Sequence, residues 1–414
     1  MATVLAKLGS PVKLGEYGLA NAISGPVFIC SYLGLHSLLV TDSTNRFRFR
    51  DYFSLRLITS TSALILVSLI GFCIYGRITA EVICFVALGM WFDSLSDIIY
   101  AIFQSNKRAD YVGRSMLLKG ILNLSSLSLA MFLTRNVIWA AMGSSLASMV
   151  IVLFYDAPYG YKVLKNRSGG YTLPTSTFSL TTFDFRSLSV LTPVALAAIP
   201  LGLVGLFGSV TGCVPQFIIA KYLGDNQLGL YCAAAYLVNV GRVGVMAAGV
   251  AANPFLAGAF STNNYTAYRN MVVKLVGLGL LLAITAPAAA ALVGHKVMTI
   301  LYTSQYAQST VLIVMILLAG GVRYVTSMIG FSVTAARQYD IQVYWFGASL
   351  VVSVVTNLWF VPRMGLMGAA ISAGITAAIE LAIGCVILVN TIHGLKKRSE
   401  VKMVQEMACE SVQM

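Results

Sequence analysis

Two arginines lie in the middle of apolar segments, where a charge is costly. Arg242 is part of Gly241-Arg242-Val243-Gly244, and Arg323 is part of Gly320-Gly321-Val322-Arg323-Tyr324. Because an ionised side chain at membrane depth costs at least about 2.5–3.5 kcal/mol, each arginine should face a cavity or a partner. One interpretation is that they bind an anionic group that passes between the helices that these segments form. The alternative is a structural ion pair, or a side chain that reaches the membrane surface. The flanking glycines would let a neighbouring helix or a ligand come close.

Three acids also lie within apolar segments, at Asp93, Asp97 and Glu380. Asp93 and Asp97 are four residues apart, so they share one face of a helix. An acidic pair that faces a cavity can bind H+ or Na+, because burial and mutual repulsion favour a bound cation. In the alternative, Arg242 or Arg323 neutralises these acids. Glu380 is a further candidate for ion coupling or for charge pairing.

The sequence offers no catalytic or metal-binding motif. The seven cysteines are scattered without a CxxC pair, and His36, His295 and His393 lie far apart. P-loop, GxSxG and HExxH motifs are absent as well. We therefore expect no enzymatic activity, no cofactor and no bound metal.

The composition predicts an all-α protein that crosses a membrane many times. Hydrophobic residues make up 58% of the chain, charged residues 10%, and the mean hydropathy is +0.81. A soluble domain carries about 25% charged residues. Since a membrane helix needs about 20 apolar residues, we expect eleven, near 17–40, 54–76, 79–104, 111–133, 137–156, 187–213, 227–256, 270–294, 309–335, 341–361 and 366–392.

An internal repeat indicates that the chain is a duplicated bundle. Leu8-Gly9, a short polar turn and Leu14-Gly15-Glu16-Tyr17 recur as Leu223-Gly224, a turn and Leu228-Gly229-Leu230-Tyr231. The second copy follows an apolar segment near 187–217, whereas almost nothing precedes the first copy. We therefore expect twelve helices in the complete repeat, with the first one upstream of this sequence.

The basic residues predict the orientation in the membrane. Most of the 28 lysines and arginines fall in alternate loops or in the C-terminal tail. The positive-inside rule places those loops and the C-terminus in the cytoplasm, and it also explains the net charge of +13 without nucleic acid. With one helix upstream, both halves have six helices and enter from the same side, as parallel repeats do.

Four regions follow from this division. Residues 1–156 form an N-terminal bundle of five helices, and residues 157–186 form a basic cytoplasmic linker. Residues 187–393 form a C-terminal bundle of six helices. Residues 394–414 form a basic cytoplasmic tail, whose lysines and arginines suit anionic lipid headgroups.

Residues 6–60 resemble the start of the polysaccharide-exporter family, the oligosaccharide-lipid flippases of bacterial O-antigen and capsule synthesis. The resemblance is carried by Leu8-Gly9, Leu14-Gly15-Glu16-Tyr17-Gly18-Leu19-Ala20-Asn21-Ala22, Pro26, Arg50-Asp51-Tyr52 and Arg56, and in the second half by Pro215 to Gly224, Leu228 to Tyr231 and Pro254. It covers nearly the whole chain. Drug exporters of the same multidrug/oligosaccharidyl-lipid/polysaccharide superfamily share the bundle of two six-helix halves.

The resemblance implies a substrate, namely a polyprenyl-diphosphate-linked oligosaccharide that alternating access moves from the cytoplasmic to the outer leaflet for O-antigen, capsule or exopolysaccharide synthesis. It also implies a bacterial inner membrane location, with polysaccharide polymerase and glycosyltransferases as possible partners. We expect Arg242 and Arg323 to contact the diphosphate, and Asp93 and Asp97 to couple transport to H+ or Na+. The alternative is a cation-coupled small-molecule or multidrug exporter of the same superfamily.

Overall fold

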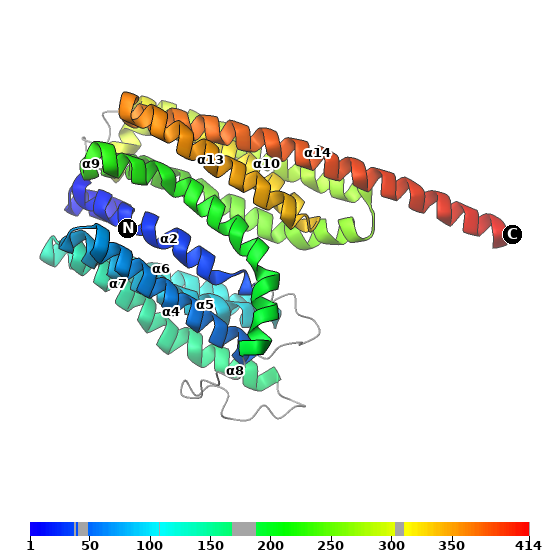
Figure 1. The fold of residues 1–414 in the computed structure, drawn as a ribbon, viewed down its shortest axis with the longest axis horizontal. Coiled ribbons are helices and arrows are strands. Elements are labelled where there is room, and N and C mark those ends of the chain that lie inside the picture. The colour runs from blue at the N-terminus through cyan, green and yellow to red at the C-terminus, as the bar shows by residue number, and fades with distance from the viewer. Residues whose placement is uncertain (37–38, 40–48, 107, 168–187, 303–309, 414) are drawn as a thin grey trace. The chain divides into compact units, whose positions relative to one another are not determined.

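The computed structural model describes residues 1–36, 39, 49–106, 108–167, 188–302 and 310–413 (Figure 1). The described chain is almost entirely helical, and it contains nine helices that are long and apolar enough to cross a membrane. One of these, α9 (Leu188–Ser261), has 74 residues, which at about 1.5 Å per residue is enough for two crossings. Counting α9 twice and adding α2 (Pro11–Tyr32), which is less apolar, gives the eleven predicted segments.

Contacts divide the chain into two units, residues 1–217 and 218–414. The predicted second bundle begins at residue 187, so the division by contacts falls later, within α9. Gly202 and Gly205 of α9 lie against Leu33 and Ile29 at the end of α2. This packing joins the first part of α9 to the first unit, although the sequence repeat assigns it to the second half.

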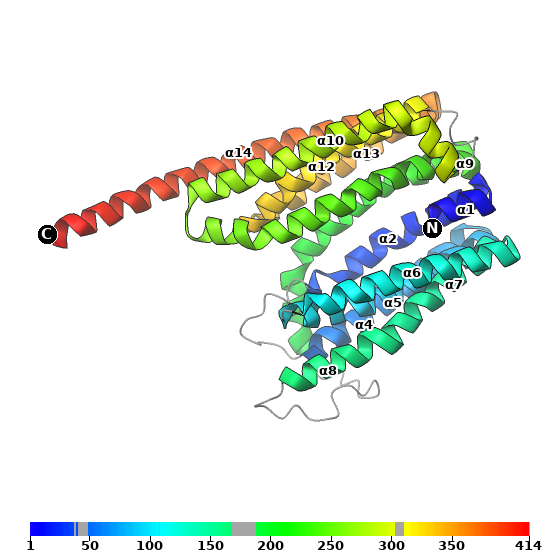
Figure 2. The same cartoon turned by 180° about the vertical axis from the view of Figure 1, so that it is seen from behind.

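The first unit is a bundle of helices joined mostly by short turns. Its further elements are α1 (Ala2–Leu8), α4 (Phe49–Ile74), α5 (Arg77–Ser105), α6 (Ala109–Thr134), α7 (Val137–Ile151), the π-helical turn η1 (Val152–Asp156) and α8 (Ala157–Arg167). Figures 1 and 2 show α4, α5, α6 and α7 side by side. Because α5 contacts α2, α4, α6 and α7, it is the central helix of this unit.

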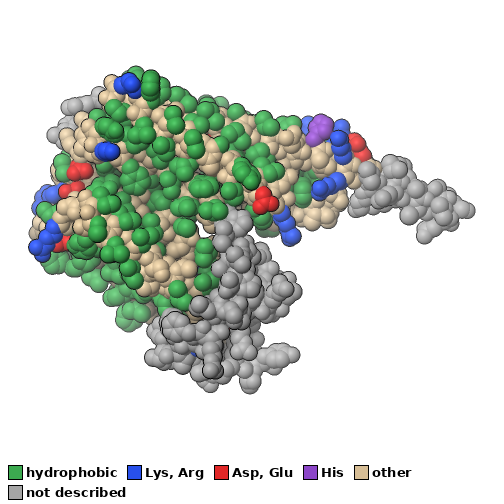
Figure 3. Space-filling model, viewed as in Figure 1, with side chains coloured by type: hydrophobic (Ala, Val, Ile, Leu, Met, Phe, Trp, Pro, Cys, Tyr) green, Lys and Arg blue, Asp and Glu red, His purple; other side chains and the backbone are tan. Residues whose placement is uncertain are grey.

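The outward faces of the helices are apolar. Phe72, Leu117 and Phe154 are among the large hydrophobic side chains that are exposed. In Figure 3 the visible surface is largely hydrophobic, with few charged side chains on it. An exposed apolar surface of this extent is what lipid requires of a protein. The buried faces, by contrast, contain many small and polar residues.

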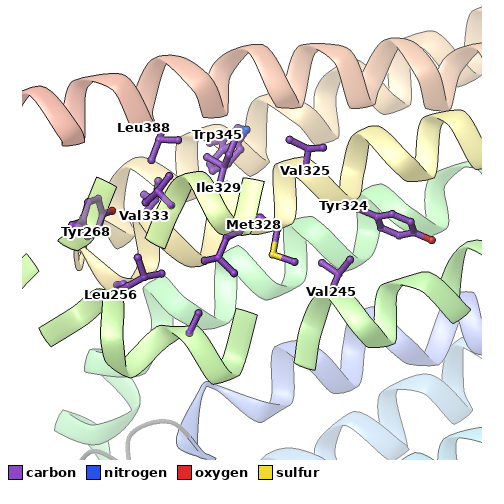
Figure 4. Close-up of a cluster of buried hydrophobic side chains, with 14 of the residues drawn as sticks. Val245, Leu256, Tyr268, Tyr324, Val325, Met328, Ile329, Val333, Trp345 and Leu388 are labelled. Carbon is purple, nitrogen blue, oxygen red and sulfur yellow. The ribbon is translucent and has the colours of Figure 1, made fainter. Parts of the chain in front are cut away.

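The second unit has one large hydrophobic core. Besides the later part of α9 it contains α10 (Tyr265–Leu301), α12 (Thr310–Ala335), α13 (Tyr339–Met364) and α14 (Leu366–Gln413). Figure 4 shows side chains from these helices converging, with Trp345 and Met328 at the centre. The indole Nε1 of Trp345 donates a hydrogen bond to the backbone oxygen of Glu380 at 2.8 Å. This bond fixes α13 against α14.

Glycines allow close helix packing beside both intramembrane arginines. Gly241 lies against the ring of Tyr324, Gly320 against Val238, and Gly321 against the backbone of Ala283. The glycines next to Arg242 and Arg323 therefore serve contacts between α9, α10 and α12. Contacts between helices therefore explain Gly241, Gly320 and Gly321 without a ligand. Gly244 differs, because it has open space beside it.

Three predicted boundaries differ from the structure. The turn expected between 213 and 227 is helical except at Gly224, where φ is +80° and ψ is 174°. Helix α14 does not end near residue 392 but continues through the predicted tail, whose Lys, Glu, Gln and Met residues are good helix formers. Helix α8 occupies the start of the predicted linker 157–186, and residues 168–186 lie outside the described part.

The repeated motif forms a helix break in both copies. In the first copy α1 ends at Leu8, Gly9 is non-helical, and α2 begins at Pro11. The side chain of Ser10 caps α2 by accepting a hydrogen bond from the backbone nitrogen of Lys13 at 3.4 Å. In the second copy the break falls on Gly224, which the repeat aligns with Gly9.

Candidate functional site

Helix α5 presents a polar face to the interior of the first unit. Asp93, Ser96, Asp97 and Tyr100 follow the spacing i, i+3, i+4 and i+7, which places all four side chains on one side of a helix. The segment after α2, helices α4 and α6 and the turn η1 supply their partners. The prediction that Asp93 and Asp97 share a face agrees with this arrangement.

The carboxylate of Asp97 lies between two basic groups. Its Oδ2 accepts a hydrogen bond from Nη2 of Arg56 at 2.5 Å, and its Oδ1 lies 3.0 Å from Nδ1 of His36. Arg56 is completely buried, and its guanidinium carbon lies 4.5 Å from the centroid of the Tyr32 ring. Since a buried charge must be paired, Asp97 and the ring face of Tyr32 keep Arg56 in place.

The carboxylate of Asp93 pairs with Lys119 of α6. The Nζ atom of Lys119 lies 2.9 Å from Oδ1 of Asp93 and 2.8 Å from Oγ of Ser96. The Lys119 side chain is only 13% exposed, whereas that of Asp93 is 44% exposed. Asp93 therefore remains reachable from outside the packed interior, while Lys119 is held within it.

A third carboxylate, Asp156, is fully buried next to this pair. It accepts hydrogen bonds from the hydroxyl groups of Ser96 and Ser115, both at 2.6 Å. The hydroxyl of Tyr100 lies 2.7 Å from that of Ser115 and extends the same network. Asp156 ends the π-helical turn η1, and such turns often occur at functional sites.

These side chains form two bonded groups along one face of α5, one of His36, Arg56 and Asp97 and one of Asp93, Lys119 and Asp156, the last joined through Ser96. We call the two groups together the first-unit charge network. When all three carboxylates are ionised and His36 is neutral, the two positive charges of Arg56 and Lys119 leave the network with a net charge of −1. Burial makes an unbalanced charge unfavourable. One bound proton or one monovalent cation would balance the network.

In the second unit, Arg323 and Glu380 form a loose ion pair. The Nε atom of Arg323 lies 3.5 Å from Oε2 of Glu380, and neither atom has a hydrogen-bond partner among the described residues. The Glu380 side chain is 9% exposed and that of Arg323 is 34% exposed. Two of the predicted site residues are thus brought together, at a separation longer than that of a normal charged hydrogen bond.

Arg242 lies apart from these groups. It is exposed on a face of α9 that also carries Val240, Val243 and Met246. It has no hydrogen-bond or ion-pair partner among the described residues. Because its neighbour Gly241 makes the contact with Tyr324 of α12, Arg242 itself is turned away from that helix.

Four residues of the network were not recognised as site residues in the sequence. Arg56 and Lys119 lie close to the starts of predicted helices, where a basic residue is common, and His36 lies far in sequence from the other two histidines. Asp156 is the last residue of a predicted helix. The one available signal was Arg56, which belongs to the Arg50-Asp51-Tyr52…Arg56 pattern of the family resemblance.

Comparisons with known proteins agree on the fold. No family model matches the chain. The capsular polysaccharide biosynthesis protein CapF of Staphylococcus aureus is 21% identical over 380 residues, which are 91% of each protein. An inward-facing multidrug resistance transporter of the MATE family, in the MOP superfamily, matches over 96% of this chain and 94% of its own, with a TM-score of 0.75 and 15% identity.

The lipid II flippase MurJ, in its inward closed conformation, matches over 97% of this chain and 87% of its own, with a TM-score of 0.70 and 11% identity. The chain therefore has the fold of MATE and MurJ transporters. Both similar structures are transporters, which is consistent with the expectation that this protein is not an enzyme.

Proposed function

We propose that this protein is a flippase that moves a polyprenyl-diphosphate-linked oligosaccharide from the cytoplasmic to the outer leaflet of a bacterial inner membrane, for the synthesis of a surface polysaccharide. The likeness to the lipid II flippase MurJ and to CapF, which is named for capsular polysaccharide biosynthesis, supports this substrate class. The observation that carries the proposal is Arg242, an exposed guanidinium in the middle of an apolar helix that has no acidic partner in the described part of the chain.

A diphosphate is a suitable ligand for such a guanidinium. Arginine binds phosphate oxygens through two parallel hydrogen bonds, and the attraction is stronger where water is excluded. Arg323 is a second candidate contact, because its pairing with Glu380 at 3.5 Å is loose enough to be exchanged for a phosphate oxygen. In this proposal Glu380 is the charge partner of Arg323 when no substrate is bound.

Transport against a gradient needs an energy source, and the first-unit charge network is suited to ion coupling. Asp93 and Asp97 are the predicted coupling acids, and both are paired with basic groups in this structure. Because a buried net charge of −1 is unfavourable, binding one H+ or Na+ would stabilise the network. The C-terminus is cytoplasmic in this proposal, on the side where glycosyltransferases make the substrate, whereas the polymerase that uses the flipped lipid acts on the outer side.

Replacing Arg242 and Arg323 by glutamine tests the substrate assignment. We expect each single variant to lower surface polysaccharide about tenfold or more, and the double variant to abolish it, since losing a charge-assisted hydrogen bond to the substrate costs about 1.5–3 kcal/mol and about 1.4 kcal/mol is a factor of ten. The measurement is polysaccharide on cells whose own gene is deleted, normalised to the amount of protein in the membrane.

The matched control is Arg363→Gln. Arg363 is exposed at the end of α13, where its guanidinium lies over the Trp359 ring, so its loss should leave polysaccharide within about twofold of the wild type. Normal polysaccharide levels in the double variant would refute the role of both arginines.

The alternative is a cation-coupled exporter of small organic molecules, which the likeness to a multidrug resistance transporter supports. Organic cations would be repelled by Arg242 and would require acids and aromatic rings instead. A deletion strain that becomes sensitive to cationic drugs while its surface polysaccharide stays normal would favour this alternative over the flippase.

A further inference from the structure

The imidazole of His36 lies between oxygen atoms of α5. Its Nδ1 is 3.0 Å from Oδ1 of Asp97 and 3.0 Å from the backbone oxygen of the same residue, and its Nε2 is 3.2 Å from Oε1 of Gln104. All three oxygens are acceptors, so both ring nitrogens are placed to donate. Only the protonated imidazolium can donate from both nitrogens.

A neutral His36 fits the same place only after a rearrangement. With its single proton on Nδ1, the ring would still donate to Asp97, but Nε2 would then have to accept from the amide group of Gln104. That amide would have to turn by half a rotation to present its NH2 group. The two protonation states of His36 therefore differ in the orientation of the Gln104 amide.

The charges around His36 favour the protonated state. Arg56 of α4 and Lys119 of α6 are the cations of the network, and Asp93, Asp97 and Asp156 are its carboxylates. Tyr32 of α2 covers Arg56, and Asp51 is the acid in the first turn of α4. Protonating His36 brings the net charge of the network from −1 to zero. The His36 side chain is 25% exposed, so protons can reach it.

Protonation of His36 also acts on Arg56. The two groups share one carboxylate, with His36 on Oδ1 of Asp97 and Arg56 on Oδ2. The Nε and Nη1 atoms of Arg56 have no hydrogen-bond partner among the described residues, so Asp97 provides the one ion pair of this buried guanidinium. An imidazolium competes for the charge of Asp97 and weakens that pair, whereas loss of the proton strengthens it.

The chain turns sharply just before His36. Leu33 and Gly34 have φ angles of +48° and +60°, and this turn brings the segment after α2 back onto α5. His36 thus connects α2 to α5, and Arg56 connects α4 to the same carboxylate. We propose that His36 carries the proton that couples transport to the proton gradient. When His36 is protonated, Asp97 binds the segment after α2 more strongly, and when His36 loses the proton, Asp97 binds Arg56 of α4 more strongly. This inference rests on the proposed flippase function.

The test uses the full chain in proteoliposomes with a fluorescent polyprenyl-diphosphate lipid, with and without an imposed pH gradient. We expect the gradient to accelerate wild-type flipping several-fold. In His36→Gln, the ratio of the flipping rate with the gradient to the rate without it should fall to about one, because glutamine keeps a hydrogen bond but cannot take up a proton at these pH values. His36→Arg, with a permanent charge, should also lose the acceleration.

The control is His393→Gln, an exposed histidine on α14, which should keep the full acceleration. A second measurement does not depend on transport, namely the titration of His36 by NMR of the labelled protein in nanodiscs. Its midpoint should fall by about one pH unit in Asp97→Asn, because the carboxylate that stabilises the imidazolium is removed.

Three outcomes would overturn the assignment of His36: full gradient acceleration in His36→Gln, a wild type that flips the lipid with no response to the gradient, or a midpoint that does not move in Asp97→Asn. A wild type that does not flip the lipid at all would refute the proposed function instead. In that case the NMR titration would still decide whether His36 and Asp97 form a proton site.

Discussion

At the scale of single residues, the two units differ in how closely their intramembrane charges are paired. Each carboxylate of the first-unit charge network has a basic or hydroxyl partner within 3.0 Å. In the second unit Arg323 and Glu380 are 3.5 Å apart, and Arg242 has no partner among the described residues. Since removing charges from water is costly unless they are paired, the second unit is less well compensated and has more to gain from an anionic ligand.

Glycine packing beside Arg323 gives a prediction at this scale. A Cβ added at Gly321 would lie 2.8 Å from Cα of Ala283, so Gly321→Ala forces α12 away from α10. We expect a loss of about 1–3 kcal/mol of stability, as in other overpacked interiors, and a lower melting temperature in detergent. Gly277→Ala on α10 is the control, because a Cβ there meets no atom within 4 Å. Equal melting temperatures for the two variants would contradict this account of the packing.

At the scale of elements, helix breaks position the functional groups. The π-helical turn η1 ends with Asp156, which faces Ser96 and Ser115, and the turn after α2 directs His36 onto α5. In α9 the break at Gly224 separates the part that packs on α2 from the part that carries Arg242. The turn η1 and the turn after α2 thus place Asp156 and His36 where an uninterrupted helix would point them elsewhere.

The break in α9 can be tested by substitution. At φ +80° and ψ 174° a residue with a side chain is strained, by about 1–3 kcal/mol, whatever space surrounds it. We expect Gly224→Ala to lower the melting temperature and to reduce transport together. Gly212→Ala, at a helical position of the same element with open space beside it, should change neither. A Gly224→Ala protein as stable and active as Gly212→Ala would show that the break is dispensable.

At the scale of the whole molecule, the chain combines an apolar exterior with an excess of 13 positive charges. The positive-inside rule predicts that one set of loops is cytoplasmic and that residues at opposite ends of α6 face opposite sides of the membrane. Arg108 precedes this helix and Arg135 follows it. The same rule predicts the side of the C-terminus. Two points of the chain lie on the same side of the membrane when an even number of crossings separates them.

Cysteine labelling in intact cells tests this orientation. In a background with the native cysteines replaced by serine, Arg135→Cys should react with a membrane-impermeant thiol reagent added outside, and Arg108→Cys should react only after the cells are opened. The measurement is the labelled fraction of the protein. Labelling of Arg108→Cys from outside would reverse the predicted orientation and place the C-terminus outside as well.

The sequence by itself determined what depends on local pattern. Apolar runs of about 20 residues predicted an all-α membrane protein and its eleven crossing segments, because backbone groups in lipid must be paired within a helix. A spacing of four placed Asp93 and Asp97 on one face. The repeated Leu-Gly motif predicted a break in both halves, and Gly9 and Gly224 are non-helical.

Only the tertiary structure decided which charges meet. Arg56 is 41 residues from Asp97, and Lys119 is 26 residues from Asp93, so no spacing rule relates them. Both bases looked like hydrated residues near helix ends until the packing of α4 and α6 on α5 enclosed them. Helix packing also assigned the glycines beside Arg242 and Arg323 to neighbouring helices. Which groups are buried together depends on the order of helices in the bundle, and the periodicity of a single helix contains no information about that order.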